Sequence, residues 1–245
     1  MRVVPAGETF TFHIVLVGRA IEHLPIIILA WRRALAKGLG ASDGTGDLLR
    51  VQDDAGQTIY SAEDGQVNTN TTSNGVSPAP TGELAPQCVT LHFQTPLRLQ
   101  QNGHALAPHR LAPRSLVMAA ARRGSLLAKF HGGGEPAIDW TALTAEADAI
   151  TDQRQLEWRD WTRYSSKQKT TMQLGGVIGQ WELRGDLTHA LPWLKLGERL
   201  HVGKETVFGL GQYRLTITPP THKPPNTEKS CEPPPQATER KEEIT

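Results

Sequence analysis

The order of patterned segments after residue 87 most constrains what this chain can fold into. Short runs of β-branched and aromatic residues predict strands, and longer apolar repeats that end at glycine predict helices. The predicted segments are a strand at 88–93 (CVTLHF), helices at 113–130 and 140–150, strands at 155–164 and 175–186, a helix at 187–200 with Pro192 as a kink or restart, and a strand at 212–218 (QYRLTIT). Apart from the short helix, this order is strand, helix, strand, strand, helix, strand, which defines a ferredoxin-like unit.

The first part of the chain predicts a second, shorter unit. Residues 8–17 (ETFTFHIVLV) favour a strand, residues 21–36 a helix with Pro25 in its first turn, and residues 48–52 a short strand. A Ser-, Thr-, Asn-, Gly- and Pro-rich stretch follows at 61–84. The fold class is therefore α+β, with tandem ferredoxin-like (RRM-like) domains of which the first is incomplete. We expect four regions: 1–60 as the partial N-terminal domain, 61–85 as a flexible linker, 86–218 as the C-terminal domain, and 219–245 as a disordered Pro-rich tail.

Charge is distributed unevenly along the chain. The whole sequence has 26 Lys and Arg against 25 Asp and Glu, which excludes a uniformly basic nucleic-acid coat. Residues 86–218, however, contain 16 basic and 11 acidic residues, whereas residues 1–85 contain 6 basic and 9 acidic residues. A polyanion is therefore expected to bind the second domain.

Several function classes lack their signature. Two cysteines, Cys88 and Cys231, cannot form a disulfide framework or a four-cysteine zinc site, and a reducing cytoplasm is the expected location. The histidines are scattered without other ligands in register, so we expect no metal and no cofactor. The longest apolar run, residues 24–31, is too short for a membrane span, which needs about 20 residues. A nucleotide P-loop fails because Glu205 stands where Ser or Thr would bind magnesium.

The segment HVGKETVFGLGQY (residues 201–213) is the strongest local signal. Its three glycines allow backbone amides to approach an anion, Lys204 adds a positive charge, and Phe208 and Tyr213 offer stacking faces. The alternative is a plain glycine turn between a helix and the last strand, with Phe208 inside.

A second segment, WRDWTRYSSKQK (residues 158–169), interleaves aromatic with basic side chains. Aromatic rings stack on unpaired bases and cations hold phosphates, so this composition suits RNA. A strand with buried tryptophans and a solvated charged edge explains the same composition.

These motifs resemble those of the bacterial CRISPR repeat-processing endoribonucleases of the RAMP superfamily. The similar blocks are LGGVIGQWELRGDL and LPWLKLGERLHVGKETVFGLGQYRLTI at the C-terminal end, WRDWTRYSSKQKTTMQLGG before them, FQTPLRLQQNG and RRGSLLAKF further upstream, and GETFTFHIVLVGRAIEHLPIIILAWRRALAKGLG at the start. The residues that match the family's glycine-rich pattern are His201, Gly203, Lys204, Thr206, Phe208, Gly209, Gly211 and Tyr213.

The resemblance implies metal-independent cleavage of CRISPR repeat RNA (pre-crRNA) by its own 2′-hydroxyl, which gives guide RNAs. On this basis we hypothesise that His201 transfers a proton and Lys204 stabilises the phosphorane, with His23 as a reserve catalytic candidate. The alternative is that His201 only packs beside the loop and Lys204 only holds backbone phosphates. The residues expected to hold RNA are Arg163, Tyr164, Lys167, Lys169, Gly203, Thr206, Phe208, Gly209, Gly211 and Tyr213. The expected partners are repeat RNA or crRNA and other CRISPR effector or adaptation proteins.

Members of the family usually have a further segment ahead of the first strand, so we expect the first domain here to lack its opening strand and helix. This departure favours an alternative function, a RAMP-type subunit that binds crRNA in an effector complex without cutting it. A ferredoxin-like domain with an unrelated ligand is the third possibility.

Overall fold

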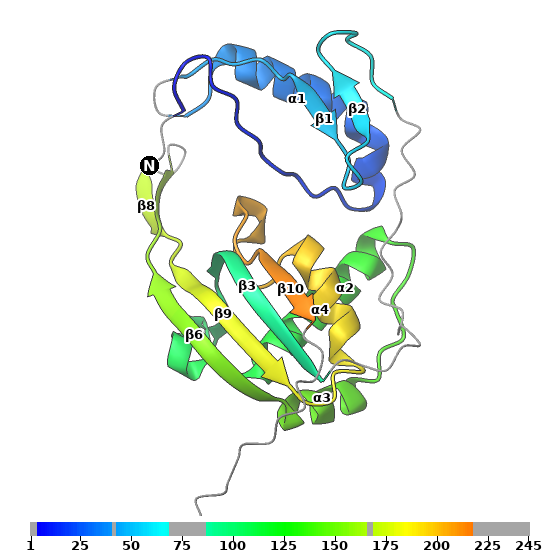
Figure 1. Cartoon of the computed structure of the whole chain (residues 1–245), viewed down its shortest axis with the longest axis vertical. Coiled ribbons are helices and arrows are strands. Elements are labelled where there is room, and N and C mark those ends of the chain that lie inside the picture. The colour runs from blue at the N-terminus through cyan, green and yellow to red at the C-terminus, as the bar shows by residue number, and fades with distance from the viewer. Residues whose placement is uncertain (1–3, 41–42, 69–86, 166–168, 218–245) are drawn as a thin grey trace, which may run out of the picture.

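The computed structural model describes residues 4–40, 43–68, 87–165 and 169–217. The predicted tail at 219–245 and most of the predicted linker lie outside these residues. Within them, the chain forms an N-terminal lobe and a larger C-terminal unit (Figure 1).

The C-terminal unit contains a four-stranded antiparallel sheet in the order β10-β3-β9-β6. Its strands are β3 (Cys88–Leu97), β6 (Thr151–Arg159), β9 (Gly176–Arg184) and β10 (Tyr213–Ile217). The last strand lies beside the first, and the third lies between the first and the second. With a helix after the first strand and another after the third, this is the ferredoxin-like topology. The predicted fold of this unit is confirmed.

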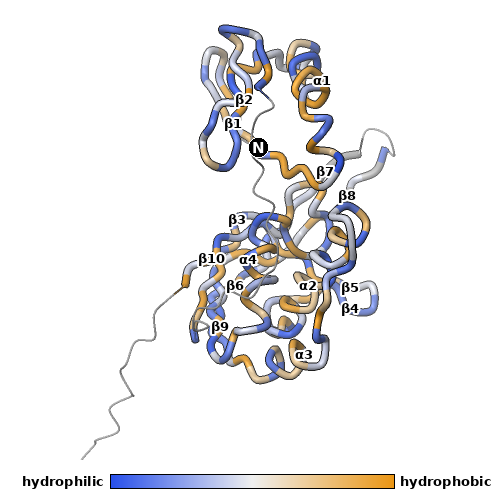
Figure 2. Tube along the Cα trace, turned by 90° about the vertical axis from the view of Figure 1, so that its right-hand side faces the viewer, coloured by the Kyte–Doolittle hydropathy of each residue, from blue (hydrophilic) through white to orange (hydrophobic). Residues whose placement is uncertain are grey.

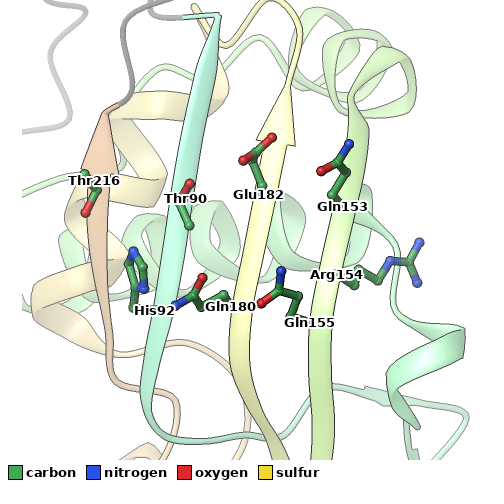
Figure 3. A pocket seen from close by; sticks show the side chains of 8 residues that line it. All are labelled: Thr90, His92, Gln153, Arg154, Gln155, Gln180, Glu182 and Thr216. Atoms are coloured by element: carbon green, nitrogen blue, oxygen red, sulfur yellow. The ribbon is translucent and has the colours of Figure 1, made fainter. Parts of the chain in front are cut away.

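Three helices belong to this unit: α2 (Pro113–His131), α3 (Trp140–Ala149) and α4 (Ala190–Leu200). They lie on one face of the sheet and leave the other face open (Figures 1 and 3). Alternate residues of the central strands, such as Leu91 on β3 and Trp181 and Leu183 on β9, point toward the helices and are fully buried. Successive side chains of a strand point to opposite faces of the sheet. Every second residue therefore faces the helices, and the residues between them lie on the open face.

Close helix packing depends on a glycine in α2. A Cβ added at Gly124 would lie 2.9 Å from both Leu196 and the Trp193 ring of α4. Pro192, expected to kink or restart the helix, is the third residue of α4 and lies in its first turn, where backbone amides have no partner within the helix. The amides of His189 and Ala190 instead donate to the carboxylate of Glu146 on α3, at 2.8 and 2.7 Å.

Short elements complete the C-terminal unit. They are the hairpin β4 (Gln100–Gln101) and β5 (His104–Ala105), the hairpin β7 (Thr162–Ser165) and β8 (Thr170–Gln173), and the 3₁₀ turns η2 (Pro108–Arg110) and η3 (Thr206–Phe208). The β7–β8 hairpin continues from β6 and β9, since the Leu174 amide donates to the Trp161 carbonyl oxygen.

The N-terminal lobe consists of η1 (Gly18–His23), α1 (Leu24–Lys37) and the hairpin of β1 (Arg50–Gln52) and β2 (Thr58–Ser61). The predicted helix and the short strand at 48–52 are confirmed. The predicted strand at 8–17 is wrong: these residues form no ladder with any described strand, and the described strands of this lobe, β1 and β2, pair with each other. A β-rich pattern becomes a strand only when a neighbouring strand accepts its backbone hydrogen bonds.

Contacts between described residues link the lobe to the C-terminal unit. Arg199 at the end of α4 forms an ion pair with Asp54 in the β1–β2 turn. A Cβ added at Gly18 would collide with the His131 carbonyl oxygen, so η1 lies directly against the C-terminal end of α2.

Candidate nucleic-acid interface

The glycine-rich segment at 201–212 runs from the end of α4 to the start of β10 and lies against the end of β3. Thr95 ties it down with one hydroxyl, which donates to the Gly209 carbonyl oxygen at 2.7 Å and accepts from the Gln212 amide at 2.9 Å. The Lys204 amide donates to the Arg98 carbonyl oxygen at 2.8 Å. The loop is therefore held by the strand on which it rests.

Two glycines are required by close backbone approach. A Cβ at Gly211 would collide with the carbonyl oxygen of Val202, and a Cβ at Gly203 would lie 2.6 Å from that of Arg98. Both residues also have a positive φ, 75° and 100°. Their places in the motif are explained by packing of the loop on itself and on β3.

The expectation that the loop amides form an anion nest is wrong for most of them. The amides of Val202, Lys204, Phe208, Gly209, Leu210, Gly211 and Gln212 all donate within the fold. An amide that already donates to a carbonyl or hydroxyl oxygen is not free for a phosphate. What the loop offers a ligand is therefore mainly its side chains.

His201 lies at the end of α4 in a backbone conformation (φ 60°, ψ 158°) that is essentially confined to glycine. Its side chain is half-buried. Burial and, next, the charge of Arg123 lower the pKa of this imidazole, while the Leu210 backbone acts in the opposite direction. Arg123 itself donates from Nε to the Leu200 carbonyl oxygen at 2.9 Å. The neutral imidazole is therefore favoured at neutral pH.

The exposed edge of the loop carries Lys204, Val207 and Phe208. Lys204 is exposed, and 86% of Val207 and 37% of Phe208 is accessible to solvent. Thr206 and Gly209, which the sequence also assigned to RNA, begin and follow the η3 turn that presents Phe208. A cation and an aromatic ring thus lie close together in the chain on one exposed turn.

Tyr213 does not belong to this exposed surface, and its contact with RNA stays a prediction. It is 1% exposed, and its hydroxyl donates to the Leu194 carbonyl oxygen at 2.5 Å. Its ring meets Phe93 edge to face, with the centroids 5.8 Å apart. Burial, with the Glu198 charge next, raises the pKa of Tyr213 well above its usual value. As the first residue of β10, it points toward the helices and closes the core.

The second predicted RNA segment forms the arm of β7 and β8. Arg163 and Tyr164 lie on β7, paired with Met172 and Thr171 of β8, and Lys169 lies exposed in the turn with φ 50°. Lys167 is outside the described residues. At the base of the arm Trp158 and Trp161 are 38% and 43% exposed, and the Trp158 indole donates to Asp160 at 2.8 Å. The interpretation with buried tryptophans is wrong.

His23 is exposed at the end of η1, in the N-terminal lobe. No hydrogen bond among the described residues connects it to His201 or to the glycine-rich loop. The part of the chain that the structure describes contains no group of three metal-binding side chains and no helix long and apolar enough to cross a bilayer.

One polar surface escaped the sequence-based interpretation. The open sheet face carries His92 on β3, Gln180 on β9 and Gln153 and Gln155 on β6, around a shallow pocket (Figure 3). The signal was present as polar residues at alternate positions of each strand, but only the strand order shows that they form one surface.

The four-stranded antiparallel sheet with its helices on one face places this unit in the ferredoxin-like α+β class. A sequence model of the family described as CRISPR-associated endoribonuclease Cas6 matches residues 91–213, half of the chain. The chain therefore belongs to this family. A second model, described as an N-terminal domain, matches residues 1–72.

Solved structures of the family share low identity with this chain. Thermus thermophilus Cas6 is 17% identical with a TM-score of 0.41, and the match covers 54% of each chain. A Cas6 product complex is 18% identical with a TM-score of 0.46, over 77% of this chain and 71% of the other. A Cas6–RT–Cas1–Cas2 complex is 18% identical with a TM-score of 0.47, over 70% of this chain and 19% of the other. The chain thus spans about half the length of Thermus thermophilus Cas6. No curated protein matches it.

Proposed function

We propose that this chain is an endoribonuclease that cleaves CRISPR repeat RNA (pre-crRNA) into guide RNAs without a metal. The single observation that carries this function is the match of residues 91–213 to the Cas6 family. The placement of His201 and Lys204 around one loop is compatible with it.

The proposed reaction is an internal transesterification. The 2′-hydroxyl loses its proton and its oxygen attacks the adjacent phosphorus, while the bond to the 5′-oxygen breaks and that oxygen takes up a proton. The products are a 2′,3′-cyclic phosphate and a 5′-hydroxyl. The lowered pKa of His201 supports a role as proton acceptor, since a general base must be unprotonated at working pH. Lys204 supplies a compact positive charge for the phosphorane.

RNA holding is assigned to the β7–β8 arm and to the side chains of the glycine-rich loop. Arg163, Tyr164, Lys167 and Lys169 would bind backbone phosphates and stack on unpaired bases, and Phe208 offers a further stacking face. Exchange of Lys167 and Lys169 for glutamine should weaken binding and reduce its salt dependence. Unchanged affinity at several salt concentrations would remove the arm from the interface.

Cleavage of labelled transcripts that carry the repeats of the same genome tests the activity. In EDTA, we expect a product with a cyclic phosphate end. His201→Ala should reduce the rate about 100-fold or more if His201 transfers a proton. His109→Ala, which changes an exposed histidine of η2, is the matched control and should cleave at the wild-type rate. His23→Ala examines the reserve candidate in the same assay. A wild-type rate for His201→Ala would remove it from the mechanism.

The paired amides of the loop favour one second candidate, a crRNA-binding subunit that does not cut. A loop whose amides already bond within the fold offers few donors for a developing oxyanion. The EDTA assay separates the two functions, because the binding subunit would retain repeat RNA intact. Other CRISPR effector or adaptation proteins remain proposed partners in either case.

A further inference from the structure

The open face of the C-terminal sheet carries a site that the proposed chemistry does not use. It is a shallow pocket of about 370 Å³, at the lower end of the range of ~300–1,000 Å³ for small-molecule sites. The residues that line it are Thr90, His92, Gln153, Arg154, Gln155, Gln180, Glu182 and Thr216. We call it the sheet-face pocket. A pocket of this size holds one small planar group.

The strand register arranges all of these residues except Arg154 in two rows across the sheet. Gln155 pairs with Gln180, Gln180 with His92, and His92 with Arg214 of β10. The second row consists of Gln153, Glu182, Thr90 and Thr216, paired in the same way. Neighbouring strands are about 4.8 Å apart, so each row presents a polar group at that interval.

The residues that line the sheet-face pocket offer no free cation for a phosphate, and Arg214 at the end of the first row is not one of them. Arg154 is one of the lining residues, but its side chain points away from the others (Figure 3). Its guanidinium forms an ion pair with Asp152 and lies over the Trp181 ring, 5.8 Å from the centroid. The Glu182 carboxylate forms an ion pair with Arg184. The inner surface of the pocket is therefore close to neutral.

Its amides and hydroxyls are available for a ligand. Within the described part of the chain, the side chains of Gln153, Gln155 and Gln180 form no hydrogen bond, and the same holds for the hydroxyls of Thr90 and Thr216. Each glutamine amide offers two donors and one acceptor. A nucleobase edge presents a donor beside an acceptor, so a single glutamine amide can bond to both, and such bidentate contacts discriminate among bases.

We propose that the sheet-face pocket binds the edge of an unpaired nucleobase of the RNA substrate, with Gln155 and Gln180 as the specificity-determining residues. This proposal deepens the proposed function and rests on it for the identity of the RNA. β3 connects the pocket to the loop: His92 lies three residues before Thr95, roughly 10 Å along the strand. The proposal therefore requires an RNA strand bound at the loop to follow β3 to the pocket.

The chemistry of this face opposes two other modes of binding. No phenylalanine, tyrosine or tryptophan lines the pocket, and His92 is the single ring in its lining, so it lacks the paired aromatic platform of the usual RRM kind. Its lining residues are polar rather than apolar, unlike the core of a protein–protein interface. Recognition by hydrogen bonds to a base edge remains the mode that fits the residues present.

The test compares the full chain with a double variant that carries Gln155→Ala and Gln180→Ala. The probes are short single-stranded RNA homopolymers of A, C, G and U and an abasic ribose–phosphate oligomer of the same length. Binding is measured by fluorescence anisotropy at several salt concentrations. We expect one or two homopolymers to bind the wild type best, and the double variant to lose about ten-fold affinity for those alone. Affinity for the abasic oligomer and the salt slope should stay unchanged.

A matched control carries Gln100→Ala and Gln101→Ala, which remove two exposed amides from the β4 strand, away from the pocket. It should bind every probe like the wild type. Equal losses for all probes, or no loss, would overturn the proposal. So would a change in oligomeric state of the Gln155 and Gln180 variant in sedimentation, which would assign this face to a second copy of the chain.

The two proposals fail separately. If the wild type cleaves repeat RNA in EDTA but shows no base preference among the homopolymers, the nuclease proposal stands and the pocket proposal is rejected. Base-selective binding that depends on Gln155 and Gln180, without any cleavage, keeps the pocket and rejects the nuclease activity.

Discussion

Gly209 and Gly211 lie two residues apart and have similar φ values of 85° and 75°, but their surroundings differ. Nothing lies within 4 Å of a Cβ at Gly209, whereas at Gly211 the Val202 backbone occupies the space. We expect Gly209→Ala to lower the free energy of unfolding by about 1 kcal/mol through backbone strain. Gly211→Ala should cost about 3 kcal/mol or more, because the backbone must also move. Urea denaturation measures both, and equal losses would contradict the close approach.

His201 should make stability depend on pH. Burial, then Arg123, lowers its pKa in the folded chain, so the folded state binds fewer protons than the unfolded state. The contribution of the neutral His201 imidazole to the free energy of unfolding is complete above the unfolded-state pKa of about 6.5. It is lost as the pH falls through the lower pKa of the folded state. Between about pH 7 and pH 5, the wild type should therefore lose more stability than His201→Gln. Urea denaturation at each pH, with His109→Gln as control, measures this; parallel curves would show that His201 titrates normally.

At the level of secondary-structure elements, α4 depends on a cap from another helix. Glu146 of α3 accepts hydrogen bonds from the amides of His189 and Ala190, and its charge lies at the positive end of α4. We expect Glu146→Ala to lower the free energy of unfolding by about 1–2 kcal/mol.

Asp148, two residues further along α3, provides the control for that prediction. It forms an ion pair with Arg114 at 2.8 Å, and both side chains are about half exposed. Such a pair is screened by solvent, so Asp148→Ala should cost less than about 0.5 kcal/mol. If both variants lost the same stability in thermal and urea unfolding, the cap would have no special role.

The elements of the C-terminal unit were predictable because their apolar residues repeat with the right period. The strand at 8–17 had an equally clear pattern, but no described strand lies beside it to complete a ladder. β6 begins at Thr151, four residues before its predicted start, because its polar residues there pair with β9 without an apolar signal. Whether a strand forms and how far it extends depends on the strand that pairs with it. The periodicity of a local sequence gives no information about that partner.

The residues of the candidate site also include some that the sequence predicted and others that it did not. The exposed positions of Lys204 and Phe208 followed from the motif, whereas the burial of Tyr213 did not. Tyr213 ends the same motif, but the register of β10 turns it toward the helices. The sheet-face pocket was missed because its residues come from four strands that are far apart in sequence.

At the scale of the whole molecule, the buried residues are divided unequally between the two lobes. The C-terminal unit has a large core around Trp181 and Leu91. The cluster in the N-terminal lobe contains Ile28, Ile59 and Tyr60, with a few partly buried neighbours. Large apolar residues such as Phe10, Ile14 and Ile26 remain exposed there, and the extended segment at 8–17 is mostly hydrophobic (Figure 2). Because buried apolar area supplies most of the stabilisation, the two lobes should differ in local stability.

Hydrogen exchange of the full chain measures that difference directly. Amides of α1 and α2 are both bonded within a helix, so the comparison isolates the packing around them. We expect α1 amides to exchange about ten-fold faster or more than those at the centre of α2, because opening the smaller cluster exposes less apolar surface. The few contacts between the lobes, such as the exposed Arg199–Asp54 pair, would then transmit little of the stability of the larger core. Equal protection of both helices would instead show that the lobes unfold as one cooperative unit.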